Sequence, residues 1–266
     1  PGCADIHNKI GVAFMDSGEP FEAIKHFNEA IRLDDHLPNT YSNLSLVLQD
    51  IGDINGAYKE LDKAINCVAD NLAWRLRRIL LLPVIPSSTS EIKRTRKNLA
   101  SNLKSLDKSN LIIHDPEYSV GTIGFYLSYH GMPNKKLLTQ ITTFLINHCP
   151  ILTFTAKHCK QFTKKKQPKI LKIGFVSSFL TSHTIGKLNQ GIIKQLSKSR
   201  FRITIFCLPS SLKDVEEVYN NFADIICLSG ELEKNHNIIA REKLDILFYP
   251  DIGMSPKTYY LAFARL

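Results

Sequence analysis

A period of 34 residues constrains the fold of the first third of the chain more than any other sequence feature. Seven residues in one stretch are matched by residues of similar size or character 34 positions later. The matched pairs are Ile10 and Leu44, Phe14 and Leu48, Gly18 and Gly52, Ala23 and Ala57, Phe27 and Leu61, Ala30 and Ala64, and Ile31 and Ile65. The alanines allow two helices to approach closely, and the glycines suit turns that need a permissive backbone. The period therefore predicts helix pairs stacked along the chain.

This pattern resembles the tetratricopeptide repeat, a helix–turn–helix unit. We expect repeats at about 4–37 and 38–71, followed by a partial third repeat that begins at Leu72 and ends a first domain at 1–82. So few repeats bury little core of their own, and we therefore expect further repeats before Pro1.

The region at 83–168 has a less regular pattern. Prolines and serines at 83–90 mark a break after the repeats. Apolar residues at helical spacing then predict amphipathic helices at about 91–106 and 134–147. A lysine-rich run at 164–169 is interpreted as a solvated linker. We expect this region to be a mostly helical connection.

Strands alternate with helices in the last part of the chain, at 169–266. The apolar runs predict strands at 170–176, 201–207, 223–228 and 244–249, and helices at about 186–198, 213–221, 232–243 and after Pro256. This alternation predicts parallel βαβ units with right-handed crossovers. The expected fold class is therefore α + α/β, with helical hairpins followed by a Rossmann-like parallel lobe.

Polar residues follow the first and fourth predicted strands, where parallel sheets bind ligands. The first strand is followed by hydroxyl side chains and by His183, which stands just before a helix. A histidine there can take or steer a proton near neutral pH, and the alternative interpretation is a surface or capping histidine. After the fourth strand, which we expect to be buried, Asp251 suits a turn and a ligand contact equally well. Ser255, before Pro256, is interpreted mainly as a helix N-cap.

The segment at 172–178, followed by His183 and then by Gln190-Gly191-Ile192, resembles the opening of the catalytic region of O-linked N-acetylglucosamine transferases. The similarity is greatest with the SPINDLY-like branch of that family. Further segments that resemble the branch are 125–131, 149–152, 244–254 and 260–266, so the resemblance extends over nearly the whole chain. Two residues depart from the family pattern, because Phe179 replaces an acidic residue and Thr184 replaces a proline.

The resemblance implies an inverting GT-B glycosyltransferase that moves a sugar, typically GlcNAc, from a UDP-sugar to Ser or Thr hydroxyls of proteins. It implies that His183 is a base or an orienting residue beside the acceptor hydroxyl. The residues that would contact substrate are Ser178, Thr181, Ser182, Thr184, Asp251 and Gly253. No metal and no other cofactor is expected, and the repeats would present acceptor proteins. A second lobe that holds most UDP contacts is expected beyond Leu266, so we expect these 266 residues alone to be inactive.

Two other classes of function remain open from the residues alone. One is a tetratricopeptide adaptor with a non-catalytic α/β domain. The other is a nucleic-acid-binding module. The formal net charge of +9 permits it, but the basic residues are dispersed and no aromatic–basic RNA-binding motif is present.

The six cysteines form no CxxC pair and no zinc-site spacing, which is typical of reduced thiols. No apolar run is long enough for a membrane span. We therefore expect a cytoplasmic protein without membrane or nucleic-acid partners.

Overall fold

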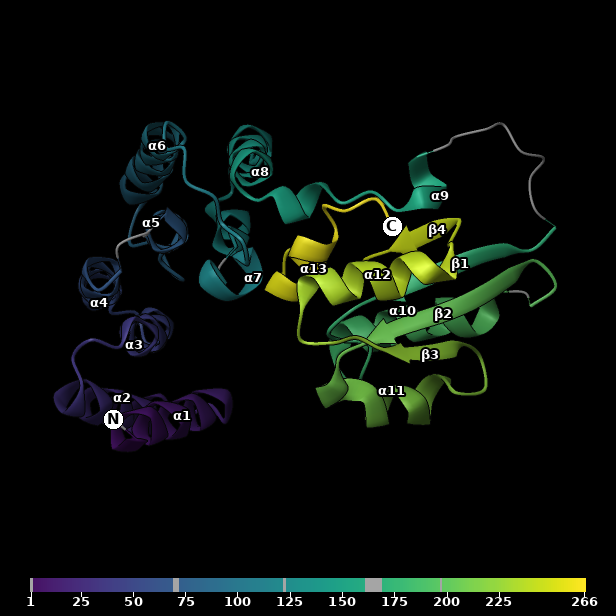
Figure 1. Cartoon of the computed structure of the whole chain (residues 1–266), viewed down its shortest axis with the longest axis horizontal. Helices are drawn as coiled ribbons and strands as arrows, with labels where there is room; N and C mark the ends of the chain where they lie inside the picture. Colours follow the sequence, from purple (N-terminus) through teal and green to yellow (C-terminus); the bar gives the residue numbers. More distant parts are fainter. Residues whose placement is uncertain (1, 69–71, 122, 161–168, 197) are drawn as a thin grey trace. The chain divides into compact units, whose positions relative to one another are not determined.

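The computed structural model describes residues 2–68, 72–121, 123–160, 169–196 and 198–266. The chain divides into two compact units, the first formed by Pro1–Ile113 and Ser119–His148 and the second by His114–Tyr118 and Cys149–Leu266 (Figure 1). Residues 161–168, which contain most of the expected lysine-rich linker, lie outside the described residues.

Helix pairs form the first part of unit one, as the sequence period predicts. The helices are α1 (Gly2–Asp16), α2 (Pro20–Leu33), α3 (Pro38–Asp50), α4 (Ile54–Asn66) and α5 (Leu72–Leu80). Gly18 and Gly52 turn the chain between the helices of each pair with φ angles of 78° and 89°, a conformation that favours glycine. The repeated alanines Ala23, Ala30, Ala57 and Ala64 are completely buried. The helix-pair prediction is confirmed.

The remainder of unit one is also helical. It contains α6 (Thr89–Leu106), the 3₁₀ helix η1 (Phe125–His130) and α8 (Lys135–His148), and α7 (Pro116–Ser119) lies where the two units meet in sequence. At the start of α6 the Ser88 hydroxyl accepts a hydrogen bond from the Glu91 backbone N–H at 3.1 Å. This capping interaction satisfies one of the N–H groups that a helix start leaves unpaired. The two helices expected in this region are confirmed.

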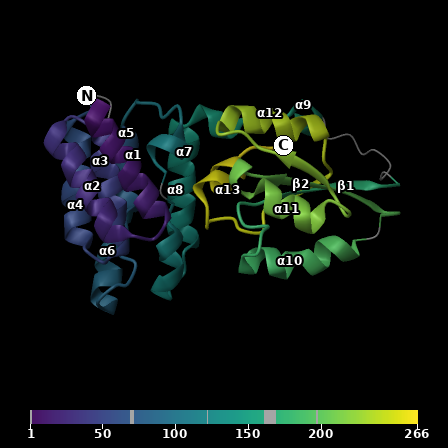
Figure 2. The same cartoon turned by 90° about the horizontal axis from the view of Figure 1, so that it is seen from below.

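Unit two contains a four-stranded parallel sheet in the order β3-β2-β1-β4. Its strands are β1 (Leu171–Val176), β2 (Phe201–Cys207), β3 (Asp224–Cys227) and β4 (Ile246–Phe248). Its helices are η2 (Pro150–Thr153), α9 (Lys157–Lys160), α10 (Thr184–Gln195), η3 (Pro209–Ser211), α11 (Leu212–Tyr219), α12 (Leu232–Glu242) and α13 (Pro256–Leu261). Figure 2 shows α10 and α12 on opposite faces of the sheet. The predicted alternation is therefore confirmed.

The central strands carry the core of unit two, whereas β4 lies at an edge. Phe175 of β1 and Ile205 of β2 are buried and pack with Tyr219 of α11. On β4, Ile246 and Phe248 are each 46% exposed. The expectation of a buried fourth strand is therefore wrong, because β4 pairs only with β1 and has no strand on its outer side in the described residues.

His236 of α12 is a completely buried histidine in unit two. Its ring stacks on Phe154, with the ring centroids 5.0 Å apart. Neither ring nitrogen has a hydrogen-bond partner among the described residues. Burial without a partner disfavours the charged imidazolium and lowers the pKa of His236 to about 4.

We predict that His236 makes the unfolding free energy depend on pH. The unfolded chain binds a proton on this ring near its ordinary pKa of 6.5, and the folded chain binds it only near 4. Stability is therefore full above about pH 6.5 and falls towards pH 4, with a slope of up to about 1.4 kcal/mol per pH unit. Urea unfolding at several pH values should show this slope in the parent chain and a smaller one in His236→Phe. The exposed His114→Phe is the control, and an identical slope in all three proteins would contradict the prediction.

Among the described residues, no helix combines the length and the apolar character needed to cross a bilayer.

Candidate functional site

The candidate site is built on the loop that leaves β1 at its carboxyl end. Val176 and Ser177 are buried, so the sheet fixes the start of the loop. The Ser177 hydroxyl accepts a hydrogen bond from the Phe179 backbone N–H at 2.9 Å, which closes a tight serine turn. This turn directs the chain towards His183 and the start of α10.

His183 is the N-cap residue of α10. Its Nδ1 atom accepts a hydrogen bond from the Ile185 backbone N–H at 3.2 Å, and its ring lies 4.7 Å from the ring of Phe179. Because the Ile185 amide is a donor, Nδ1 must be the unprotonated nitrogen of the neutral ring. The proton of the neutral ring is therefore on Nε2, which has no hydrogen-bond partner among the described residues. The exposed imidazole thus offers a ligand an N–H donor in a fixed orientation.

Gly186 holds the first turn of α10 close to the same loop. A Cβ atom at this position would lie 2.0 Å from the backbone oxygen of Thr181 and 2.8 Å from its backbone nitrogen. The Thr181 hydroxyl also accepts a hydrogen bond from the His183 backbone N–H at 3.4 Å. The position of His183 therefore depends on a backbone contact that only glycine permits.

We predict that Gly186→Ala displaces the loop at 177–185 and costs about 1–3 kcal/mol of unfolding free energy, because the new methyl group meets rigid backbone atoms. The matched control is Gly191→Ala on the same helix, where the added Cβ meets no atom within 4 Å. Gly191→Ala should leave the free energy of unfolding unchanged or raise it by up to about 1 kcal/mol, since alanine is the better helix former. Equal melting temperatures for the two variants would contradict the proposed contact.

Asp251 reaches the β1 loop from the loop after β4. Its side chain is only 1% exposed, and its Oδ2 atom accepts a hydrogen bond from the Ser178 backbone N–H at 3.1 Å. Burial raises the pKa of this carboxyl group, and the Ser178 amide is the largest influence that opposes the rise. A smaller opposing influence is the charge of His183, which therefore lies within electrostatic reach of Asp251. Asp251 thus links the loop after β4 to the loop that carries His183.

The turn after Asp251 is tight. The Asp251 carbonyl oxygen accepts a hydrogen bond from the Met254 backbone N–H at 3.0 Å. Within this turn, Gly253 has a φ of 88°, a left-handed conformation that favours glycine. Gly253 therefore shapes the loop that carries Asp251.

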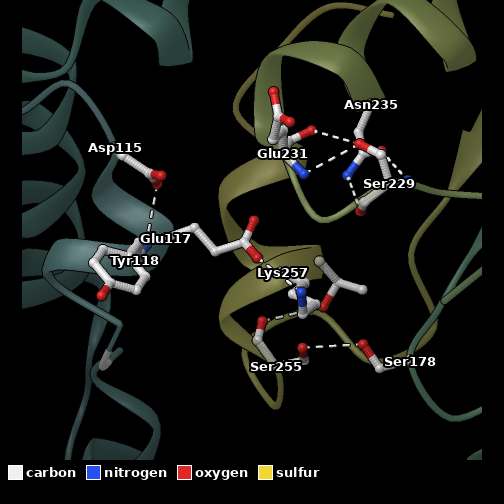
Figure 3. A network of polar contacts seen from close by, with 10 residues as sticks. Asp115, Glu117, Tyr118, Ser178, Ser229, Glu231, Asn235, Ser255 and Lys257 are labelled. Atoms are coloured by element: carbon white, nitrogen blue, oxygen red, sulfur yellow. Dashed lines mark hydrogen bonds and ion pairs between the residues drawn. The ribbon is translucent and has the colours of Figure 1, made fainter. Parts of the chain in front are cut away.

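A pair of hydroxyl groups makes a second link between the loops. The Ser178 hydroxyl lies 3.0 Å from the Ser255 hydroxyl. Figure 3 shows the two side chains pointing toward each other. Ser255 occupies the N-cap position of α13, but its side chain makes no capping hydrogen bond. The capping interpretation of the Ser255 side chain is therefore wrong. The N-cap position of Ser255 and the proline at the start of the helix are as predicted, but the Ser255 hydroxyl pairs with Ser178 instead of capping the helix.

Further polar contacts surround this edge of unit two in Figure 3. The Lys257 ammonium group lies 3.1 Å from a carboxylate oxygen of Glu117. The Ser229 backbone N–H donates to the Asn235 side-chain oxygen at 2.7 Å, which orders the loop after β3. The sequence analysis missed Lys257 and Asn235. For the contact between Ser229 and Asn235, the position of Ser229 at the end of a predicted strand was the one available signal.

The structure brings some of the expected site residues together and leaves others apart. Ser178, Asp251 and Ser255 are in direct contact, and His183 with Thr181 lies on the same loop. Ser182 and Thr184 flank the histidine and are exposed. Their side chains make no hydrogen bond to another expected site residue in the described part of the chain.

The chain matches known proteins by structure but not by sequence. No family model matches the chain, and no curated protein matches its sequence. Among solved structures, a mutant of the O-GlcNAc transferase of Thermobaculum terrenum is similar, with a TM-score of 0.60 and 11% identity. The likeness is one of fold. It covers 100% of this chain and 49% of that protein, so the chain spans about half of its length.

This comparison supports the α + α/β fold class over the whole chain, with helix pairs followed by a parallel α/β lobe. In that arrangement the loops after β1 and β4 lie at the carboxyl edge of the sheet, where α/β folds bind their ligands. The site residues described above are therefore placed where a ligand is expected.

Proposed function

We propose that this chain forms the helical repeats and the first catalytic lobe of a SPINDLY-like protein O-glycosyltransferase. The reaction transfers a sugar, GlcNAc by preference, from a UDP-sugar to Ser or Thr hydroxyls with inversion and without a metal. The observation that carries this proposal is the exposed His183 at the carboxyl edge of the sheet, fixed by its cap and by the loop that Asp251 holds. The fold likeness to an O-GlcNAc transferase supports it.

The cap of His183 favours one of the two roles open to this residue. To accept a proton at Nε2, the neutral ring would have to carry its proton on Nδ1, where the Ile185 N–H already donates. A ring held in this way donates a hydrogen bond from Nε2 instead. We therefore propose that His183 orients the acceptor hydroxyl or the reacting sugar as a donor. Ser178, Thr181, Ser182, Thr184, Asp251 and Gly253 line or shape the substrate position.

The helical repeats are proposed to present acceptor proteins in the cytoplasm. Asn8 of α1 and Asn43 of α3 lie on successive repeats, and their side-chain amides hydrogen-bond each other at 3.2 Å. The donors and acceptors that this pair of amides leaves unused can bind an extended polypeptide backbone. This arrangement supports a peptide-binding role for the repeats.

We further propose that a second lobe completes the donor site. The half-exposed apolar residues of β4 support this, since an apolar sheet edge is normally covered by further structure. Residues 1–266 alone should then give only background signal with labelled UDP-GlcNAc and a Ser/Thr-rich acceptor, and calorimetry should detect weak UDP binding at most.

The same transfer assay on a protein that also carries the second lobe tests the proposed function itself. Transfer by the two-lobed protein and none by residues 1–266 is the expected pair of results. Robust turnover by residues 1–266 would contradict the two-lobe arrangement. No transfer by the two-lobed protein would favour a non-catalytic adaptor instead.

A further inference from the structure

Unit one contains a polar groove that the glycosyl-transfer site does not use. A cavity of about 340 Å³ lies over α5 and is lined by residues of α4 and α6. A second cavity of about 390 Å³ adjoins it and shares Arg78, Ile79 and Asn102 with it. The two cavities form one continuous groove, which we call the α4–α6 groove. Figure 1 shows the three helices side by side.

The floor of the α4–α6 groove is fixed by contacts within the protein. The Arg78 guanidinium lies 3.9 Å from the centre of the Tyr58 ring and donates to an Asp62 carboxylate oxygen at 2.9 Å. The Tyr58 hydroxyl donates to the Leu81 carbonyl oxygen at 2.9 Å. These groups satisfy one another, so the floor is a preformed surface.

The α6 wall, in contrast, presents polar side chains without partners in the protein. Arg94, Asn98 and Asn102 are exposed and recur every four residues, so they lie on one side of α6. Asn55 of α4 and Arg75 of α5 face the same groove. Among the described residues, none of these five side chains has a hydrogen-bond or ion-pair partner.

The charges of the groove indicate the ligand. Of its two acidic residues, Asp62 is paired with Arg78, and the Glu91 carboxylate accepts hydrogen bonds from the Ser87 backbone N–H at 2.6 Å and the Ser87 hydroxyl at 2.7 Å. The Glu91 carboxylate keeps its negative charge, which also acts on Arg94. The three arginines of the groove, Arg75, Arg78 and Arg94, still outnumber its two carboxylates, and a guanidinium group binds a carboxylate with two parallel hydrogen bonds. The unpaired asparagine amides match the donors and acceptors of a peptide backbone.

The dimensions of the groove fit an extended peptide. From Arg94 to Ser105 the α6 wall rises about 1.5 Å per residue, which gives a length of about 16 Å. An extended chain spans about 3.3 Å per residue, so about five residues fit this length. We propose that the α4–α6 groove binds a short, extended acidic segment of a partner protein, with Arg94 and Arg75 on its carboxylates and the asparagines on its backbone.

Fluorescence anisotropy on the whole chain tests this site without any transfer reaction. The probe is a fluorescein-labelled hexapeptide of alternating Glu and Ser, and the matched peptide carries Gln in place of Glu. We expect the Glu peptide to bind at least about tenfold more tightly than the Gln peptide, because only carboxylates form charge-assisted bonds with the arginines. Its binding should also weaken with added salt.

Two charge reversals on the same helix locate the site. Arg94→Glu should weaken binding of the Glu peptide by about tenfold or more, because it places a like charge in the groove. Lys97→Glu changes the net charge equally but lies outside the lining of the groove, and it should change affinity less than about twofold. Circular dichroism checks folding, and Arg94→Gln replaces Arg94→Glu if the latter is unfolded. Failure of the parent chain to bind, equal binding of the Glu and Gln peptides, or equal losses in the two variants would overturn the proposal.

Discussion

His183→Ala, measured in a protein that joins this chain to the proposed second lobe, should lower kcat by about 10²–10³-fold while donor affinity changes only a few-fold. The loop that carries His183 starts at a buried strand end and lies at the carboxyl edge of the sheet, where the proposed function puts the donor sugar. A hydrogen bond from Nε2 to groups that develop charge in the transition state contributes mainly to the rate. The expected signature is therefore a fall in kcat with a nearly unchanged donor Kd.

The capping role of His183 needs its own control. Alanine also removes the acceptor for the Ile185 N–H, which costs about 0.5–2 kcal/mol of stability at a helix N-cap. His183→Asn retains an oxygen that can cap the helix but lacks the imidazole. It should melt close to the parent protein and be as slow as His183→Ala. A folded variant of either kind that keeps more than about a third of the parent kcat would contradict the catalytic assignment.

Asp251→Asn should slow turnover by about 10²-fold and raise stability at neutral pH. Asn keeps an oxygen for the Ser178 N–H but removes the negative charge that lies within reach of His183. A small displacement of a positioned catalytic group is worth about this factor in rate. The comparison variant Ser255→Ala removes only the hydroxyl pair with Ser178, so its rate should change much less.

The stability effect of Asp251 has a defined direction with pH. Burial raises the folded-state pKa of this carboxyl above its ordinary value of 3.8, so the folded protein holds the proton more tightly than the unfolded chain. The ionised carboxylate therefore lowers stability as pH rises through the folded-state pKa, and this cost is absent below about pH 3.8. Unfolding free energies should favour Asp251→Asn at pH 7, and the difference should shrink in acid. Parent-like turnover, or lower stability than the parent at pH 7, would contradict this account.

The fold could be predicted from the sequence because its signals are local and repeated. The 34-residue period fixes the positions of buried alanines and of turn glycines, and the structure confirms both. Apolar runs separated by helical segments likewise give the strands of the sheet. The exposure of β4 was not predictable, because the run at 244–249 has the same apolar character whether or not another strand covers it.

The candidate site was only partly predictable, because its contacts join distant segments. Ser178 and Ser255 are 77 positions apart, and nothing in either segment reveals that their hydroxyls meet. The cap of His183, in contrast, spans two residues, and the structure confirms the capping interpretation that the sequence left open. The fixed Nδ1 contact was the decisive detail for its proposed role, and it depends on a ring orientation that spacing does not encode.

The most direct test of the proposed function is the mass of a Ser/Thr-rich acceptor peptide after incubation with UDP-GlcNAc and the two-lobed protein. The account predicts that the peptide gains the mass of one or more GlcNAc residues on Ser or Thr, and that His183→Asn reduces this gain to near background at equal protein concentration. An acceptor of unchanged mass, or an equal gain with the folded His183→Asn variant, would contradict it.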